Sequence, residues 1–306
     1  ARAALKNGLK FEETLGANPF KFGLVGSTDS HIALPAVEEN SFMGKFPIYS
    51  PSPDRATHLS KESAFNKTGI KEVERLGWQY AAAGYVGVWA HENTRESIFD
   101  AMERREVYAT SGPRMTVRLF GGWNFTPDDV GRNPGDVGYA KGVPMGSDLT
   151  VAPEGKVPTF LVAALKDPIR GNLDRIQIVK GWLDANGETQ EKVYDVAWSG
   201  DRKLKKGKLS SVGNTVKTET AEWTNTIGAT ELATVWTDPN FDPSQRAFYY
   251  ARVLEIPTPR WTDYDKAFFG EEWCAEAQTE DPTACDDIPL TLQERVYTSP
   301  IWYSPA

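Results

Sequence analysis

Hydrophobic and polar residues alternate along much of the chain after about residue 114, and this alternation predicts β-strands. Asp184-Ala-Asn-Gly187 lies between two of the alternating runs, and Asn-Gly is typical of a β-hairpin turn. Short strands with turns between them and almost no helical periodicity indicate a β-sandwich-like domain over residues 115–306. The predicted strands are 115–120, 158–165, 175–184, 191–198, 247–256 and 294–303.

The first 114 residues have a different pattern. Two short apolar runs bounded by Gly, 22–28 (FGLVGST) and 85–90 (YVGVWA), predict buried strands. Residues 33–60 are too rich in Pro and Ser for regular structure, and a loop of that length inside a domain is usually functional or disordered. The change of pattern predicts two domains, 1–114 of α/β type and 115–306 of all-β type.

A helix is predicted over residues 94–105, followed by a strand and a turn over 107–113. Asn93 is the expected N-cap, and Glu96 three residues later completes a capping box. The apolar face of this helix has helical spacing and consists of Ile98, Phe99 and Met102.

Length and charge limit the classes of protein that fit. The chain has 306 residues, which is about twice a typical domain. Its net charge of −8 argues against a general nucleic-acid-binding protein, because phosphate contacts dominate that affinity. No apolar run approaches the roughly 20 residues that cross a bilayer, and no signal peptide is recognisable. The short basic run 202–208 (RKLKKGK) is expected to be a solvated hairpin tip.

The chain begins with ARAALKNGLKFEETLG, which has the pattern of a helix already under way. This start is expected either for the carboxy-terminal part of a longer protein or for a chain trimmed at its beginning.

Cys274 and Cys285 are the chain's two cysteines, and the segment between them is polar and loop-like. A disulfide that closes such a loop would stabilise the fold by roughly 3 kcal/mol and requires an oxidising compartment. Two free thiols are the alternative. A metal site at this pair is disfavoured, because there is no nearby His to complete it.

Asp29 and His31 are the strongest candidates for chemistry. On a strand, residues two apart face the same way, so Ser27, Asp29 and His31 would share one face at the end of the 22–28 run. The carboxyl ends of strands carry the chemistry in α/β folds, and a carboxylate with an imidazole can bind a divalent metal. The alternative is a capping Asp beside a packed His.

Four long motifs resemble a bacterial family related to the PHP (polymerase and histidinol phosphatase) metallohydrolases, a family catalogued as a domain of unknown function. A related branch contains carbamate-hydrolysing enzymes. The motifs begin at Asn18 (NPFKFGLVGSTDSH), Val88 (VWAHENTRESIFDAMERREVYATSGPR), Thr237 (TDPNFDPSQRAFYYARVLEIPTPRW) and Glu294 (ERVYTSPIWYSP). The resemblance covers most of the chain.

The resemblance implies the late part of a distorted (β/α)7 barrel with two or three divalent ions, followed by the β domain. Asp29 and His31 match the family's final metal-ligand pair. His91 stands where the family pattern has Glu, so no ligand role is transferred to it. The family supplies an H-x-H motif from its first strands, and this chain has none. The resemblance therefore implies that the missing amino-terminal segment of the same protein is a partner of this chain.

Other polar residues are candidates for substrate contacts. His58 in the Pro-rich loop could reach over the site, although a surface position is the alternative. Arg95 and Arg114 could stabilise an anionic substrate or transition state, with ordinary salt bridges as the alternative. His91 is included with them as a substrate contact.

The leading hypothesis is a metal-dependent hydrolase of phosphoesters or related small-molecule esters, with Zn, Mn or Fe as the divalent ion. The alternative is a non-catalytic β-sandwich binding or structural module with a degenerate barrel remnant. The cysteine pair and the family habit of export favour a periplasmic or secreted protein. The sequence leaves the oligomeric state open, a homo-oligomer included.

Overall fold

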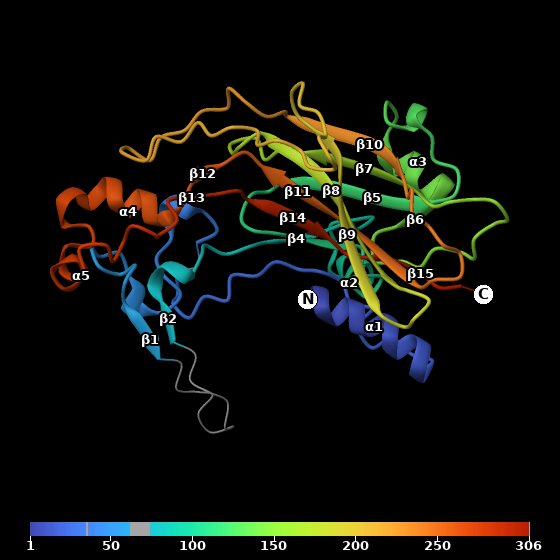
Figure 1. The fold of residues 1–306 in the computed structure, drawn as a ribbon, viewed down its shortest axis with the longest axis horizontal. Coiled ribbons are helices and arrows are strands. Elements are labelled where there is room, and N and C mark those ends of the chain that lie inside the picture. Colours follow the sequence, from blue (N-terminus) through green and yellow to red (C-terminus); the bar gives the residue numbers. More distant parts are fainter. Residues whose placement is uncertain (35, 62–73, 306) are drawn as a thin grey trace.

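The computed structural model describes residues 1–34, 36–61 and 74–305. Within these residues the fold is dominated by antiparallel β-sheets with few helices (Figure 1).

The larger sheet has seven strands in the order β3-β4-β14-β11-β8-β9, and β15 pairs with one end of β11. All of its neighbouring strands are antiparallel. Its strands are β3 (Val86–Val88), β4 (Val107–Thr110), β8 (Leu173–Leu183), β9 (Thr189–Trp198), β11 (Ala247–Glu255), β14 (Arg295–Thr298) and β15 (Ile301–Tyr303).

The smaller sheet has four antiparallel strands in the order β10-β7-β5-β6. Its strands are β5 (Thr116–Gly122), β6 (Gly142–Pro144), β7 (Thr159–Leu165) and β10 (Glu231–Thr237). Inward-facing residues of both sheets form one core, in which Leu119 and Phe160 of the smaller sheet join Ile178 and Tyr249 of the larger. The two sheets therefore pack face to face, as in a β-sandwich.

Two helices cover the outer faces of the sandwich. Helix α1 (Arg2–Leu15) places Leu5 and Leu9 against the larger sheet, beside Val179 and Phe248. Helix α3 (Pro134–Lys141) packs Val137 against the smaller sheet. Helix α2 (Arg95–Glu103) connects β3 to β4.

The remaining helices lie beside one end of the sheets, in what we call the α4 lobe (residues 36–61, 74–83 and 260–292; Figure 1). Its aromatic core contains Phe42, Tyr49, Tyr80 and Trp261. Arg55 forms a bidentate ion pair with Asp265, with distances of 2.5 and 2.7 Å, and joins the loop to α4. The lobe and its border contain α4 (Trp261–Phe269), α5 (Ala275–Glu280), β1 (Leu59–Lys61), β2 (Glu74–Leu76), β12 (Thr258–Pro259) and β13 (Thr291–Leu292).

Short 3₁₀ helices complete the regular structure of the described residues. They are η1 (Glu39–Ser41), η2 (Pro47–Tyr49), η4 (Gly77–Gln79), η5 (Pro127–Asp129) and η6 (Gly270–Glu272).

The disulfide predicted between Cys274 and Cys285 is confirmed, and both cysteines are buried in the core of the α4 lobe. The backbone N–H of Cys274 also donates to the carbonyl of Pro53 at 3.1 Å. The disulfide therefore closes the segment around α5, and the hydrogen bond to Pro53 fixes that segment to the loop that precedes β1. No helix in the described part of the chain combines the length and the apolar character needed to span a bilayer.

The predicted β-rich part agrees with the structure, but the expected part of a (β/α)7 barrel is not shown. The described residues contain no closed barrel, and β3 and β4 pair antiparallel although α2 connects them. A (β/α)7 barrel requires parallel strands at such a connection. Because β4 pairs with β14, the larger sheet crosses the predicted domain boundary at residue 114. The division into 1–114 and 115–306 stays a prediction.

Candidate functional site

The segment that carries Asp29 is extended but is not a strand, so the prediction of a strand over 22–28 is wrong. Its polar backbone groups bond to scattered partners instead of one neighbouring strand. The N–H of Leu24 donates to Ser299 Oγ at 3.0 Å, and the carbonyl of Ser27 accepts from Gly84 N–H at 3.0 Å. These bonds hold the segment across the ends of β3, β4 and β14.

Gly26 is the point of closest approach between this segment and the sheet. A Cβ atom there would lie 2.3 Å from the carbonyl oxygen of Tyr85 and 2.5 Å from that of Thr110. Only glycine fits between these two carbonyls. The segment before Asp29 is therefore fixed in position by its backbone.

Asp29 and His31 are brought together as predicted, but by a different geometry. Asp29 has a φ of 44°, in the left-handed region, so the pairing does not come from a pleated strand. Its Oδ1 lies 3.6 Å from His31 Nε2, and both side chains are exposed. The His31 ring packs against Phe46, with centroids 4.6 Å apart.

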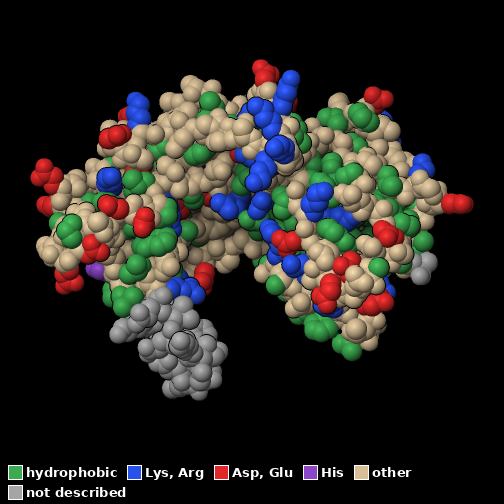
Figure 2. All heavy atoms as spheres, viewed as in Figure 1, with side chains coloured by type: hydrophobic (Ala, Val, Ile, Leu, Met, Phe, Trp, Pro, Cys, Tyr) green, Lys and Arg blue, Asp and Glu red, His purple; other side chains and the backbone are tan. Residues whose placement is uncertain are grey.

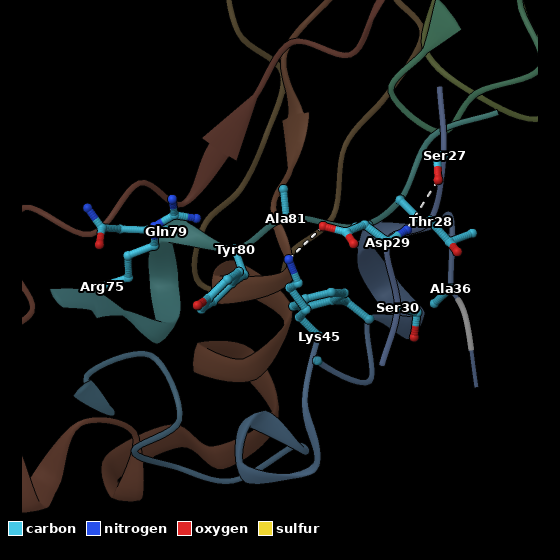
Figure 3. Close-up of a pocket in the computed structure, with 14 residues that line it drawn as sticks. Ser27, Thr28, Asp29, Ser30, Ala36, Lys45, Arg75, Gln79, Tyr80 and Ala81 are labelled. Carbon is cyan, nitrogen blue, oxygen red and sulfur yellow. Dashed lines mark hydrogen bonds and ion pairs between the residues drawn. The ribbon is translucent and has the colours of Figure 1, made fainter. Parts of the chain in front are cut away.

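Lys45 is the third member of this group and was not predicted from the sequence. Its Nζ lies 2.6 Å from Asp29 Oδ2, and Figure 3 marks this contact with a dashed line. The hydrogen bond and charge of Lys45 lower the pKa of Asp29, with a smaller effect from His31. The carbonyl of Lys45 also accepts the backbone N–H of His31 at 2.9 Å. Pairing of these two loop segments was not encoded in any local pattern, because the residues are 16 positions apart.

A pocket of about 270 Å³ opens beside Asp29 and Lys45 (Figure 3). Ser27, Thr28 and Ser30 line it together with Asp29 and Lys45. Further residues of its wall are Arg75, Gln79, Tyr80, Ala81, Ala82 and Ala83. The pocket thus combines acidic, basic and hydroxyl groups, which suits a polar ligand.

The wall of the pocket is fixed to α4 by a buried carboxylate. Glu39 Oε1 accepts from Ala82 N–H at 3.0 Å, and its Oε2 accepts from Trp261 N–H at 2.8 Å. Arg260 Nη2 and Trp261 Nε1 both donate to the carbonyl of Tyr80. Burial raises the pKa of Glu39. Three hydrogen bonds therefore hold the backbone of residues 80–82 from behind, and the bond from Trp261 N–H fixes Glu39 itself to the start of α4.

A metal ion would find two donor side chains here, the Asp29 carboxylate and the His31 imidazole. The ammonium of Lys45 already lies on Asp29 at hydrogen-bond distance, so this carboxylate is placed to hold a positive charge. No group of three or more His, Cys, Asp or Glu residues within the described chain is arranged to hold a metal ion. The two donors fit part of a coordination sphere, and other ligands would have to come from water, substrate or another polypeptide.

The four predicted substrate contacts do not line this pocket. His58 Nδ1 lies 3.2 Å from the carbonyl of Ile48, and the residue is half-buried. His91 and Arg95 are exposed near the start of α2. Arg114 stacks over the ring of Tyr85 at 5.8 Å and lines a different pocket, of about 290 Å³, with Tyr108 and Val86. Substrate contact by any of the four stays a prediction.

A second polar group lies inside the fold and was not predicted. Glu255 of β11 donates its N–H to the carbonyl of Glu294, the residue just before β14, so the two residues are neighbours across the two strands. Both are fully buried, and neither oxygen of Glu255 has a hydrogen-bond partner among the described residues. Ser111 donates to Glu294 Oε2. Burial raises the pKa of Glu294 to about 7 and the pKa of Glu255 well above its usual value.

No curated protein matches this chain, and no solved structure matches it. Residues 1–305 match one family model, DUF3604, which is described as a protein of unknown function. Because this match spans nearly the whole sequence, the chain belongs to the DUF3604 family.

Proposed function

We propose that this protein is a metal-dependent hydrolase related to the PHP metallohydrolases, and that Asp29 and His31 supply two ligands of its metal centre. The observation that carries the proposal is their convergence at the edge of a polar pocket, with Oδ1 and Nε2 3.6 Å apart. Two donors so close together can bind one cation without rearrangement of the backbone.

The chemistry follows from the groups at the pocket. A bound Zn, Mn or Fe ion would lower the pKa of a water molecule and polarise the scissile group of an ester. The Asp29 carboxylate is ionised at neutral pH, because Lys45 lowers its pKa. Lys45 lies where its ammonium could hold an anionic oxygen of the substrate, such as that of a phosphoester or a related ester.

The remaining ligands are expected from outside the described residues. The resemblance to a late barrel segment makes an amino-terminal segment of the same protein the proposed source. A periplasmic or secreted location is proposed because a buried disulfide is compatible with an oxidising compartment.

One observation favours the alternative, a non-catalytic binding or structural module. The described residues offer two donors at the pocket, and Lys45 already neutralises one of them. Such an arrangement suits a protein whose pocket binds a polar ligand without chemistry. The two functions differ in whether the chain binds a divalent ion through Asp29 and His31.

Titration of the purified chain with Zn²⁺ or Mn²⁺ by calorimetry separates them. We expect one site whose affinity falls at least tenfold in Asp29→Asn and in His31→Ala, because each removes a ligand atom. Matched controls are Asp128→Asn and His91→Ala, which change exposed residues away from the pocket and should retain wild-type affinity. The hydrolase proposal fails if metal binding stays absent even when the proposed amino-terminal segment is supplied, or if binding is unaffected by both substitutions at the pair.

A further inference from the structure

The basic run 202–208 forms a well-defined hairpin tip. Lys205 and Lys208 exchange backbone hydrogen bonds of 2.9 and 3.1 Å. Lys206 and Gly207 between them have φ values of 51° and 74°. Two consecutive residues with positive φ are the mark of a type I′ turn, which joins strands tightly. The predicted hairpin tip is therefore present.

The base of this hairpin is anchored in the sandwich. Arg202 Nη2 lies 2.7 Å from Asp174 Oδ1, and Asp174 is fully buried. The carbonyl of Arg202 accepts from Trp198 Nε1 at 2.7 Å, and Arg202 Nε donates to the carbonyl of Ser199. These bonds connect the hairpin to the ends of β8 and β9, so its charges project from a fixed base.

Within the part of the chain that the structure describes, the lysines of the hairpin have no acidic partners. Lys203, Lys205, Lys206 and Lys208 are exposed, and none of them forms an ion pair with any described residue. Figure 2 shows Lys and Arg side chains gathered in a stripe over the centre of one face, where β9 and the loops that follow it lie. The whole chain has a net charge of −8, so this local excess of positive charge runs against its overall character.

The patch also has an apolar component. Leu204 stands between the lysines with 44% of its surface exposed, and Leu209 is half-buried at the other end of the turn. A hollow of about 510 Å³ lies at the base, lined by Arg202, Lys203, Lys205, Lys208 and Leu209 together with Ser210 and Asp201. A cationic hollow of this kind could accept an anionic headgroup, and a projecting Leu could enter the layer beneath it.

We propose that the hairpin 202–208 binds the surface of an anionic lipid bilayer. Lysines near such a surface are attracted by its negative potential, and each adds a factor of about five to the binding constant. Leu204 would add contact with the headgroup and acyl boundary. The exposed Leu among the lysines favours lipid over a soluble polyanion, which would offer it no apolar layer. This inference does not depend on the proposed hydrolase activity.

Co-sedimentation with vesicles tests the proposal. We expect binding to phosphatidylcholine vesicles that contain phosphatidylglycerol, no binding to phosphatidylcholine alone, and weakening at high salt. The double variant Lys205→Gln/Lys206→Gln should bind roughly 30-fold more weakly, which is the loss of two such factors. Leu204→Ser should also weaken binding while leaving the charge unchanged. The matched control Lys156→Gln/Lys266→Gln removes two exposed lysines elsewhere and should bind as the wild type does.

Three outcomes would overturn the proposal: no binding to the anionic vesicles, equal binding by the hairpin variant and the control variant, or hairpin-dependent binding to heparin without any binding to vesicles. The last result would assign the patch to a soluble polyanion. Circular dichroism of each variant establishes that the fold is retained, as expected for substitutions at exposed positions.

Discussion

Asp29 holds one cation in the structure, the ammonium of Lys45, and would hold another in the proposed function. A divalent ion on the same carboxylate must either displace Lys45 or bind beside it against charge repulsion. The backbone position of Lys45 is fixed by the preceding residue. Gly44 has a φ of 90°, and a Cβ atom there would lie 2.4 Å from the carbonyl oxygen of Tyr49. Lys45 is therefore the residue that should control metal affinity from inside the pocket.

Replacing Lys45 by Met should raise the affinity for Zn²⁺ or Mn²⁺ by about tenfold, since it removes a unit charge next to the ligand oxygen. Calorimetric titration of Lys45→Met and wild-type chain measures the difference. Lys21→Met is the control, because Lys21 pairs with Glu12 and Asp148 instead of Asp29. Equal or weaker binding by Lys45→Met would show that the ammonium does not compete with the metal.

At the level of single residues, the sequence predicted that Asp29 and His31 lie close together but not the backbone geometry that brings them there. The i, i+2 spacing of Asp29 and His31 suggested a shared strand face, whereas a left-handed backbone at Asp29 brings them together. The contact of Lys45 with Asp29 depends on how two irregular segments cross, which no periodicity encodes. Glu255 and Glu294 face each other through strand register, which is a property of pairing between distant strands.

Among the elements, three strands were predicted closely. The runs at 158–165, 191–198 and 247–256 correspond to β7, β9 and β11, because runs rich in β-branched and aromatic residues favour strands. β7 and β11 are buried along almost their whole length, so they lack the exposed face that strict alternation implies. The 294–303 run is divided into β14 and β15 at Ser299 and Pro300. Helix α2 was predicted nearly to its ends, although its N-cap is Thr94 instead of Asn93. Its expected apolar face is incorrect in part, since Phe99 and Met102 are exposed.

We expect the buried pair, Glu255 on β11 and Glu294 just before β14, to make the stability of the larger sheet depend on pH. The pKa of Glu294 is raised to about 7 from an ordinary value of 4.5, chiefly by burial, while Ser111 opposes the shift and Glu39 adds to it. A raised pKa means that the folded state binds the proton more tightly than the unfolded state does. The contribution of Glu294 to the free energy of unfolding is therefore fully present below about pH 4.5 and is lost as the pH rises through about 7. Glu255 acts in the same direction, and the two carboxyls titrate as a pair.

Glu294→Gln should remove the cost of ionising this side chain. The wild type should lose free energy of unfolding between pH 5 and pH 8 because Glu294 ionises, and the variant should not have this loss. The difference in free energy of unfolding between variant and wild type should therefore grow by on the order of 3 kcal/mol from pH 5 to pH 8. Urea unfolding at the two pH values measures this change. Glu271→Gln, at an exposed glutamate, is the matched control and should follow the wild-type pH dependence. Parallel curves for wild type and Glu294→Gln would contradict the assignment.

On the scale of the whole molecule, the α4 lobe and the sandwich have different means of stabilisation. The sandwich has a large apolar core between two sheets. The lobe has a smaller aromatic core, the Arg55–Asp265 ion pair and the disulfide. Since the lobe supplies Lys45 and the Tyr80 wall, the integrity of the pocket depends on the less extensively packed part of the protein.

Reduction of the disulfide should therefore loosen the lobe before the sandwich. We expect a loss of roughly 3 kcal/mol in local stability, as for a loop of this size. Hydrogen exchange measures it: amides of α4 and α5 should exchange faster in Cys274→Ser/Cys285→Ser, while those of β8 and β11 stay protected. Unchanged exchange in α4 and α5 would show that packing and the Arg55–Asp265 pair suffice.

The pairing of β4 with β14 has a practical consequence for expression of the two predicted domains as separate proteins. A product starting after codon 114 would lack β3 and β4, and the hydrogen-bonding edge of β14 would face solvent. Bare edges of this kind recruit other chains and cause aggregation. Expression of the second half by itself should accordingly give inclusion bodies, unless a complementary strand is co-produced to cover that edge.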